Sequence, residues 1–460
     1  MPGRPVRRLP RALHVITLAL TAVTAFTAVT VGVFGPAPAL AQSCGGLGAG
    51  GEFHPLPATR IYDSRPEAAI GSPTGARPAT PGGATFTTKV LGARGVVPTD
   101  ASQVLTVVAN VTVTGATVGG YLTIHRPGAA VPDASNVNFT AGSSVPDLAF
   151  LPVDASGNVA VTVVGYGQGS VNVLIDVYGF VSSSCATTRG ARLVSLSPTR
   201  IVDTRMSAKP LGAREVRRIP FRGADGITPV VPDVVPNNRN VVGAVVNLTV
   251  VNQRPASTST FLSVLAEDPG SWPSTSTTNV VRNQVKANLA IVPVGSDGAI
   301  RVFNEQGSAD IVVDVVGYLL AGASEGTRAG RIVPLDNPFR AVDTRPRPLG
   351  PGQAEQWSFE PFTSSVRLDG QPVGNVSALF GNLTAANLRR QYPTVPVESF
   401  LTVYPSNVGL PNASNVNLRE YQDVANFALV RLGPAGKVSF FNAAGYVDYL
   451  FDVAAVVLAD

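Results

Sequence analysis

Thr199–Arg205 reads TRIVDTR, and the same seven-residue pattern occurs as TRIYDSR at Thr59–Arg65 and as FRAVDTR at Phe339–Arg345. Both intervals between copies are 140 positions long, from 59 to 199 and from 199 to 339. Solenoid repeats are roughly 20–50 residues long, so this period corresponds to a whole domain. The sequence therefore predicts three tandem copies of one domain.

Other landmarks recur in the same order within each copy. An Asn-x-Thr motif begins at Asn110, Asn247 and Asn382. An apolar segment that contains one acid closes each copy, with the acid at Asp176, Asp314 and Asp452. Short polar connectors at 185–192 and 321–331 separate the copies, so we expect them to span 42–184, 193–320 and 332–460. Each copy is long enough to bury a core of its own.

Short alternating apolar segments fill the copies, for example Val104–Val113, Asn158–Val164 and Val171–Val181. They are rich in Val, Ile and Thr and are interrupted by Gly, Pro and Asn, which is typical of strands joined by turns. Helical periodicity is almost absent. We therefore expect an all-β protein with three tandem β-sandwich domains, each with about seven to nine strands in a jelly-roll or immunoglobulin-like arrangement.

These motifs resemble a recurring domain of exported proteins in high-GC Gram-positive bacteria, which opens on Pro-Thr-Arg-x-x-Asp-Thr-Arg and ends on Val-Asp-Val-x-Gly-Tyr. The resemblance covers residues 53–459 and is most literal at 198–205 and 313–318. The third copy departs from it, with Phe339 in place of Thr and without the closing Gly-Tyr after Phe451–Asp452–Val453. Such domains occur alone or appended to secreted hydrolases, and the resemblance implies no catalytic residues.

The N-terminal 41 residues have the order of a signal peptide: four arginines, an uncharged run at Val15–Phe34 and small residues up to Ala41. We expect cleavage before Gln42 and a secreted, extracellular or cell-wall-associated protein. An uncleaved membrane anchor is the alternative, because a run of about 20 apolar residues can span a bilayer. The export route, Sec or twin-arginine, stays open.

Removal of residues 1–41 changes the charge of the chain. The segment carries four arginines and no acid, so the formal net charge falls from +5 to about +1. A nearly neutral protein offers no basic face for nucleic acid. No later apolar segment is long enough to span a membrane, so we expect no membrane contact after cleavage.

Two cysteines, Cys44 and Cys185, bracket the first copy. In an exported chain such a pair favours a disulfide, and two free thiols are the alternative. The remaining histidines, His54 and His125, lie near neither cysteine nor any acidic cluster in the sequence. We therefore predict no metal site and no cofactor.

The closing acids lie in apolar strands, where an unpaired carboxylate is costly and an arginine can satisfy it with two hydrogen bonds. We predict that the opening motif of each copy ties to the closing strand of the same copy. This predicted lock consists of Arg60, Asp63, Arg65 and Asp176 in copy one, Arg200, Asp203, Arg205 and Asp314 in copy two, and Arg340, Asp343, Arg345 and Asp452 in copy three. The functional alternative makes Asp63 and Asp176 a glycosidase pair.

Catalysis is not favoured by these motifs, because active sites seldom occur three times in one chain. The sequence contains no His-Glu-x-x-His motif. The Asn-x-Thr motifs match the glycosylation pattern but fall in predicted central strands. We expect each asparagine to bond to a neighbouring strand or turn instead.

Binding through the loops that differ between copies is the function this pattern favours, with cell-wall polysaccharide or a surface protein as the partner. Exposed aromatic residues could stack on sugar rings, although burial is the alternative for each. The candidates are Trp272, Trp357, Tyr392 and Tyr404. A structural spacer or coat component is the second hypothesis, and an accessory to or variant of a secreted glycoside hydrolase is the third.

Overall fold

The computed structural model describes residues 50–68, 70, 75–222, 234–324, 326–368, 371–389 and 397–460. These described residues belong to one compact unit. The predicted signal peptide and Cys44 lie outside the described residues, so the cleavage site and the disulfide with Cys185 stay predictions. Among the described residues, no helix has the length and apolar character that a membrane span needs.

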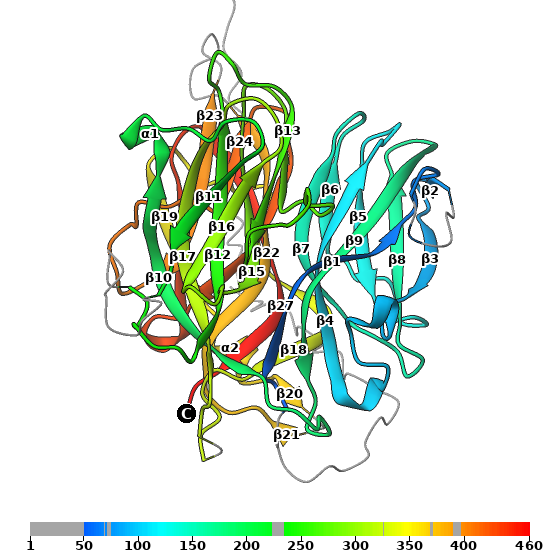
Figure 1. The fold of residues 1–460 in the computed structure, drawn as a ribbon, viewed down its shortest axis with the longest axis vertical. Coiled ribbons are helices and arrows are strands. Elements are labelled where there is room, and N and C mark those ends of the chain that lie inside the picture. Colours follow the sequence, from blue (N-terminus) through cyan, green and yellow to red (C-terminus); the bar gives the residue numbers. More distant parts are fainter. Residues whose placement is uncertain are drawn as a thin grey trace, which may run out of the picture. The chain divides into compact units, whose positions relative to one another are not determined.

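The first copy is a sandwich of two antiparallel sheets (Figure 1). Its strands are β1 (Phe53–Asp63), β2 (Arg77–Ala79), β3 (Ala84–Lys89), β4 (Val104–Thr114), β5 (Gly120–His125), β6 (Val137–Phe139), β7 (Val145–Leu151), β8 (Asn158–Gly165) and β9 (Gly169–Ser182). One sheet has the order β1-β9-β4-β7, and the other has the order β3-β8-β5-β6. This strand order in two facing sheets is that of a jelly roll. The first of the two sheets continues into the second copy, because β1 also pairs with β10 (Ala191–Asp203), and the joined strands form one nine-stranded sheet.

The second copy repeats this topology, with sheets β10-β17-β12-β15 and β11-β16-β13-β14. Its strands are β10 (Ala191–Asp203), β11 (Glu215–Pro220), β12 (Val241–Asn252), β13 (Thr260–Leu265), β14 (Thr278–Val280), β15 (Gln284–Pro293), β16 (Ala299–Asn304) and β17 (Asp310–Ala321). The short helix α1 (Thr204–Ser207) follows β10.

The third copy has the same strand order in its sheets, β18-β27-β22-β25 and β19-β26-β23-β24. These strands are β18 (Ile332–Asp343), β19 (Gln353–Ser358), β22 (Val376–Arg389), β23 (Glu398–Pro405), β24 (Val416–Arg419), β25 (Val424–Arg431), β26 (Lys437–Asn442) and β27 (Tyr446–Leu458). Helix α2 (Glu360–Thr363) and the hairpin of β20 (Arg367–Leu368) and β21 (Gln371–Pro372) lie between β19 and β22. The predicted all-β sandwich class is confirmed, with jelly-roll topology.

The two sheets of each copy differ in burial. Strand β3 alternates between half-buried and exposed residues, as expected for a sheet with one face in solvent. Strands β4 and β12 are buried along almost their whole length. One face of each of these strands packs inside its own sandwich, so the other face must be covered from outside. A neighbouring copy covers it.

A single hydrophobic core joins the three copies. Its buried members include Phe150 of the first copy, the core residues of the second copy, and Phe380 and Phe427 of the third. The Phe150 ring centroid lies 5.1 Å from that of Phe380 and 5.6 Å from that of Phe427. The first and third copies have additional cores of their own. The core of the second copy is therefore continuous with apolar residues of the first and third copies.

The repeated asparagines close the three copies into a ring. Asn110 Nδ2 donates to the Ser276 carbonyl oxygen of the second copy at 2.6 Å. Asn247 Nδ2 donates to the Ser414 carbonyl oxygen of the third copy at 2.7 Å. Asn382 Nδ2 donates back to the Ser135 carbonyl oxygen of the first copy at 2.5 Å. All three asparagines are buried, and each satisfies a backbone carbonyl of the next copy.

Candidate functional site

The opening and closing strands of each copy are neighbours in one sheet, with Arg60 opposite Asp176. Arg60 donates from Nε to Asp176 Oδ1 at 2.8 Å and from Nη2 to Oδ2 at 3.0 Å. Register shifts flank the arginine on both sides. Such bulges redirect a side chain, and here the guanidinium reaches its cross-strand partner. The result is a two-pronged bond between the ends of the copy.

The other copies contain the same bond. Arg200 Nε lies 2.9 Å from Asp314 Oδ1, and Arg340 Nε lies 2.9 Å from Asp452 Oδ1. The structure thus brings together, in every copy, the arginine and the acid that the sequence analysis placed in one lock. The pKa of Asp314 and that of Asp452 lie above their ordinary value, because burial raises them more than the hydrogen bonds from their arginines lower them.

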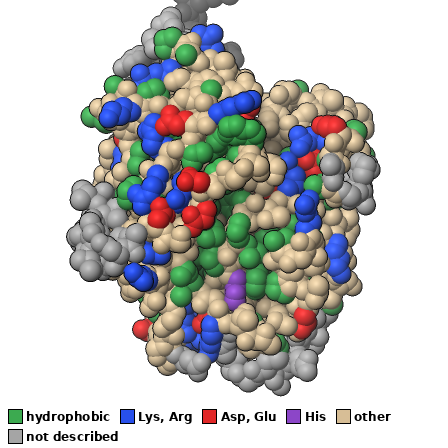
Figure 2. Space-filling model, viewed as in Figure 1, with side chains coloured by type: hydrophobic (Ala, Val, Ile, Leu, Met, Phe, Trp, Pro, Cys, Tyr) green, Lys and Arg blue, Asp and Glu red, His purple; other side chains and the backbone are tan. Residues whose placement is uncertain are grey.

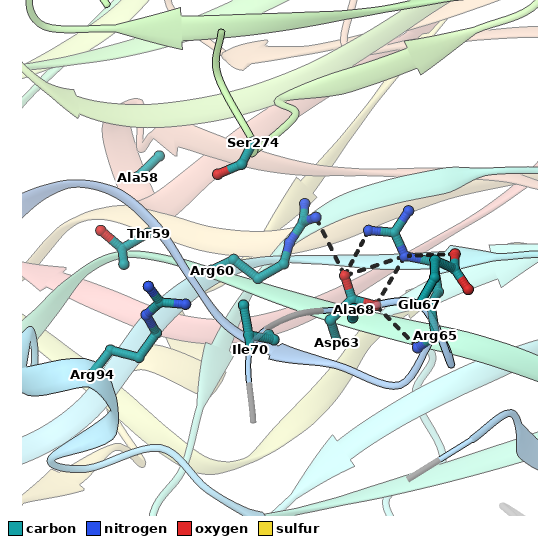
Figure 3. Close-up of a pocket in the computed structure, with 10 residues that line it drawn as sticks. All are labelled: Ala58, Thr59, Arg60, Asp63, Arg65, Glu67, Ala68, Ile70, Arg94 and Ser274. Carbon is teal, nitrogen blue, oxygen red and sulfur yellow. Dashed lines mark hydrogen bonds and ion pairs between the residues drawn. The ribbon is translucent and has the colours of Figure 1, made fainter. Parts of the chain in front are cut away.

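The second acid of the motif holds the second arginine. Asp63 accepts hydrogen bonds from the Arg65 backbone N–H at 3.1 Å and from Arg65 Nη2 at 2.6 Å. Arg60 Nη1 lies 3.4 Å from Asp63 Oδ2 (Figure 3). Burial alone would raise the pKa of Asp63, but the bonds from Arg65 outweigh it and lower that pKa. Asp63 is therefore a carboxylate held between two guanidinium groups.

A cavity of about 480 Å³ opens beside this motif. Arg60, Asp63 and Arg65 line it together with Arg94, and Ser274 reaches it from the second copy (Figure 3). It thus lies at the junction of copies one and two. We call this cavity the motif cleft.

The corresponding junctions use the same arginine but a different loop residue. Arg200 Nη1 donates to Asn412 Oδ1 of the third copy at 3.2 Å. Arg340 Nη1 lies 3.5 Å from Asp133 Oδ2 of the first copy. Ser274, Asn412 and Asp133 each precede by two positions the serine that accepts from a ring asparagine. The scaffold is constant, and the residue on the rim varies.

The chemistry of the motif cleft is governed by its ion pairs. Asp176 is fully buried under Arg60, and Asp63 is bonded to Arg65. A glycosidase needs one carboxyl group that reaches the leaving oxygen and a second that reaches the sugar ring or a water. In the part of the chain that the structure describes, no group of three or more His, Cys, Asp or Glu could hold a metal ion.

A second cavity, of about 410 Å³, lies between copies one and three. The residues lining it are Gly120, Asn138, Phe139, Thr140 and Tyr166 from copy one and Asn387, Leu388, Arg389, Tyr421 and Asp423 from copy three. Tyr166 is 69% exposed and Tyr421 is 87% exposed. We call this cavity the tyrosine groove.

Sequence analysis missed both tyrosines, although a signal was present. Tyr421 occupies a turn position with φ of 62°, where copies one and two have Gly142 at 74° and Asn283 at 64°. Gly and Asn are the usual residues for that backbone conformation, and a bulky side chain there is uncommon. A comparison of turn residues between the copies would have singled out Tyr421.

The predicted stacking residues have different environments. Trp272 is 59% exposed and lies under the Arg214 guanidinium, 5.0 Å from the ring centroid. Trp357 is half-buried and donates its indole N–H to the Tyr449 hydroxyl at 2.9 Å. Tyr404 is only 7% exposed, so it lacks the exposed ring that stacking on a ligand requires. Tyr392 lies outside the described residues.

Comparisons with known proteins add no family. No protein-family model matches the chain, and no curated protein matches it. Two viral structures are each 8% identical to this chain: one is an atomic structure of Sulfolobus turreted icosahedral virus, and the other is described as the triple jelly roll fold and turret assembly in an archaeal virus. They cover 83% and 88% of this chain, and the matches cover 86% and 90% of theirs, each with a TM-score of 0.16.

A tandem CBM22 domain structure from Paenibacillus barcinonensis is 11% identical. The match covers 59% of this chain and 98% of that one, also with a TM-score of 0.16. At this TM-score and identity, none of the three structures carries an argument about the ligand of this chain.

Proposed function

We propose that this protein is an exported, non-catalytic binding protein of the cell surface or cell wall, with its ligand sites in the clefts between copies. One observation carries the proposal. The residues that build the junctions recur in all three copies, whereas the rim residues differ, as Ser274, Asn412 and Asp133 do. A constant scaffold with variable rims is the usual organisation of binding sites.

Binding fits the motif cleft better than hydrolysis does. The carboxylate of Asp176 is hydrogen-bonded to Arg60 and is buried, and that of Asp63 is hydrogen-bonded to Arg65. On the face drawn in Figure 2, basic and acidic side chains lie among one another rather than in a field of one sign. With a formal charge near +1 after signal cleavage, this favours polysaccharide or protein over nucleic acid.

The test is retention of purified residues 42–460 on insoluble cell-wall polysaccharide and on peptidoglycan, measured as a function of protein concentration. Saturable retention, absent on an inert resin of equal surface area, is the expected result. No retention on either polymer would refute the binding function. Regular self-assembly without any ligand would then favour the structural spacer or coat component.

A further inference from the structure

Tyr421 has a backbone conformation that is unfavourable for a tyrosine. Its backbone has φ of 62°, in the left-handed region that disfavours bulky side chains, yet its ring is 87% exposed. Packing inside the protein therefore does not explain the choice of tyrosine. A turn with only a structural role takes Gly or Asn, as Gly142 and Asn283 show at the equivalent positions. The exposed ring has a role outside the fold.

Tyr166 lies in a turn that is longer in the first copy than in the other two. Its turn joins β8 to β9, and 13 positions separate Val163 from the closing acid Asp176. The corresponding separations in copies two and three are 10 positions, from Asn304 to Asp314 and from Asn442 to Asp452. The Tyr166 N–H donates to the Gly119 carbonyl at 2.8 Å, so the extension is anchored. Both tyrosines are thus peculiar to this one junction.

Polar groups between the tyrosines are held in place. Asp423 Oδ1 accepts from the Asn387 N–H at 3.3 Å, and Asn387 Nδ2 donates to Asp448 at 3.1 Å. Asn138 Nδ2 is buried without a hydrogen-bond partner among the described residues, although Asn138 lines the groove. A buried amide donor without a partner is uncommon, and a ligand hydroxyl would satisfy it.

The charges of the groove restrict the ligand. Arg389 Nη2 donates to the buried Asp448 at 2.9 Å, so this cation is already balanced. Asp423 adds a further negative charge to the lining. Acidic polymers would meet net repulsion here, whereas uncharged hydroxyl groups can donate to the carboxylate and accept from the amide.

From these features we infer that the tyrosine groove binds an uncharged polysaccharide, with sugar rings stacked on Tyr166 and Tyr421 and hydroxyl groups bonded to Asn138 and Asp423. Aromatic side chains supply flat apolar area for the C–H face of a sugar ring. A cavity of about 410 Å³ has room for a short run of sugar units. The inference rests on the proposed binding function and specifies its ligand class.

The test is affinity electrophoresis of residues 42–460 through gels that contain one soluble polysaccharide each. The probes are the uncharged glucan, mannan, galactan and xylan, and the acidic polygalacturonate. We expect retardation by at least one uncharged polymer and none by polygalacturonate. No retardation by any uncharged polymer, or retardation by the acidic one alone, would overturn the inference.

Three variants locate the site. Tyr421→Gly introduces the glycine that copy one has at this turn position, so it removes the backbone strain and should preserve the fold. Tyr166→Ala removes the second ring. We expect each to weaken binding at least about tenfold, as loss of a stacked ring does. Trp272→Ala, which removes an exposed ring of copy two, should bind as the unaltered protein does.

The outcomes separate this inference from the general function. Retention on wall polymer that survives both Tyr421→Gly and Tyr166→Ala would leave the binding function standing and place the ligand elsewhere. Loss of binding in Trp272→Ala alone would point to the second copy. Absence of retention by the unaltered protein on every polymer would overturn both.

Discussion

Asp147 stands where the other two copies have asparagine. Asn288 Nδ2 donates to Asn110 Oδ1 at 3.0 Å, and Asn426 Nδ2 donates to Asn247 Oδ1 at 3.0 Å. At the remaining position of this ring, Asp147 corresponds to Asn288 and Asn426, and Asn382 corresponds to Asn110 and Asn247. Asp147 Oδ2 and Asn382 Oδ1 are both buried without a partner among the described residues. A protonated Asp147 would supply the missing donor.

The electrostatic surroundings favour that protonated form. Burial raises the pKa of Asp147 to about 7, against the lowering by the Phe427 N–H and by the Lys286 ammonium. Lys286 is itself buried, and burial lowers its pKa to about 8. Asp147 thus keeps its proton over much of the acidic range, in which an ordinary aspartate is ionised.

Replacement of Asp147 by Asn should stabilise the protein at neutral and alkaline pH. The folded-state pKa of Asp147 lies above its ordinary value of 3.8. Protonated Asp147 therefore contributes fully to the free energy of unfolding below about pH 4, and this contribution is lost as the pH rises to about 7. The loss reaches a few kcal/mol. Thermal unfolding of both proteins between pH 4 and pH 8 measures it, and parallel pH profiles would contradict the assignment.

At the scale of the element, the arginine–aspartate bond joins the first and last strands of each copy. Asp314 is fully buried on β17 and accepts from Arg200 on β10. Asp203 contacts the same arginine at 3.3 Å but is more exposed. The two acids therefore differ in how much their removal should cost.

Asp314→Ala should lower the free energy of unfolding by about 3 kcal/mol, because Arg200 then lacks its buried partner. Asp203→Ala should cost less, about 1 kcal/mol, since water can replace its bonds in part. Denaturant unfolding of the two variants tests the order. Equal stability of Asp314→Ala and the unaltered protein would remove the structural role of the lock.

Strand patterns explain how far the elements could be predicted. In β19 the residues that face solvent alternate with half-buried ones, so periodicity identifies the strand. In β12 both faces are buried, and the mainly apolar segment Val241–Val251, interrupted by Asn247 and Thr249, shows burial without showing what covers it. Composition predicted the positions of turns. It did not predict the exposed ring of Tyr421, because composition does not give the backbone φ angle of a turn residue.

At the scale of the whole molecule, the three copies depend on one another. Most buried apolar residues of the second copy belong to the core that it shares with copies one and three. Its ring asparagine Asn247 bonds to the third copy, and its Ser276 carbonyl accepts from the first. Separation of the second copy from its neighbours would therefore expose apolar residues of this shared core.

Isolated residues 191–322 should fail to unfold cooperatively and should aggregate, because apolar residues such as Leu289 and Val245 would lose their cover. Circular dichroism on heating and size-exclusion chromatography measure both effects, with residues 42–460 as the control. A monomeric fragment with a sharp transition near that of the full chain would show that the shared core is dispensable.

Three copies of one all-β domain follow from the sequence by itself, because the motifs at Thr59, Thr199 and Phe339 repeat at one spacing and strands have local periodicity. The partner of Arg60 follows too, since a buried acid in an apolar strand requires a cation. Only the tertiary structure decided the ring of copies and the tyrosine groove. Tyr166 and Tyr421 line the same cavity because separate copies pack together, and no local sequence pattern encodes the geometry of that packing.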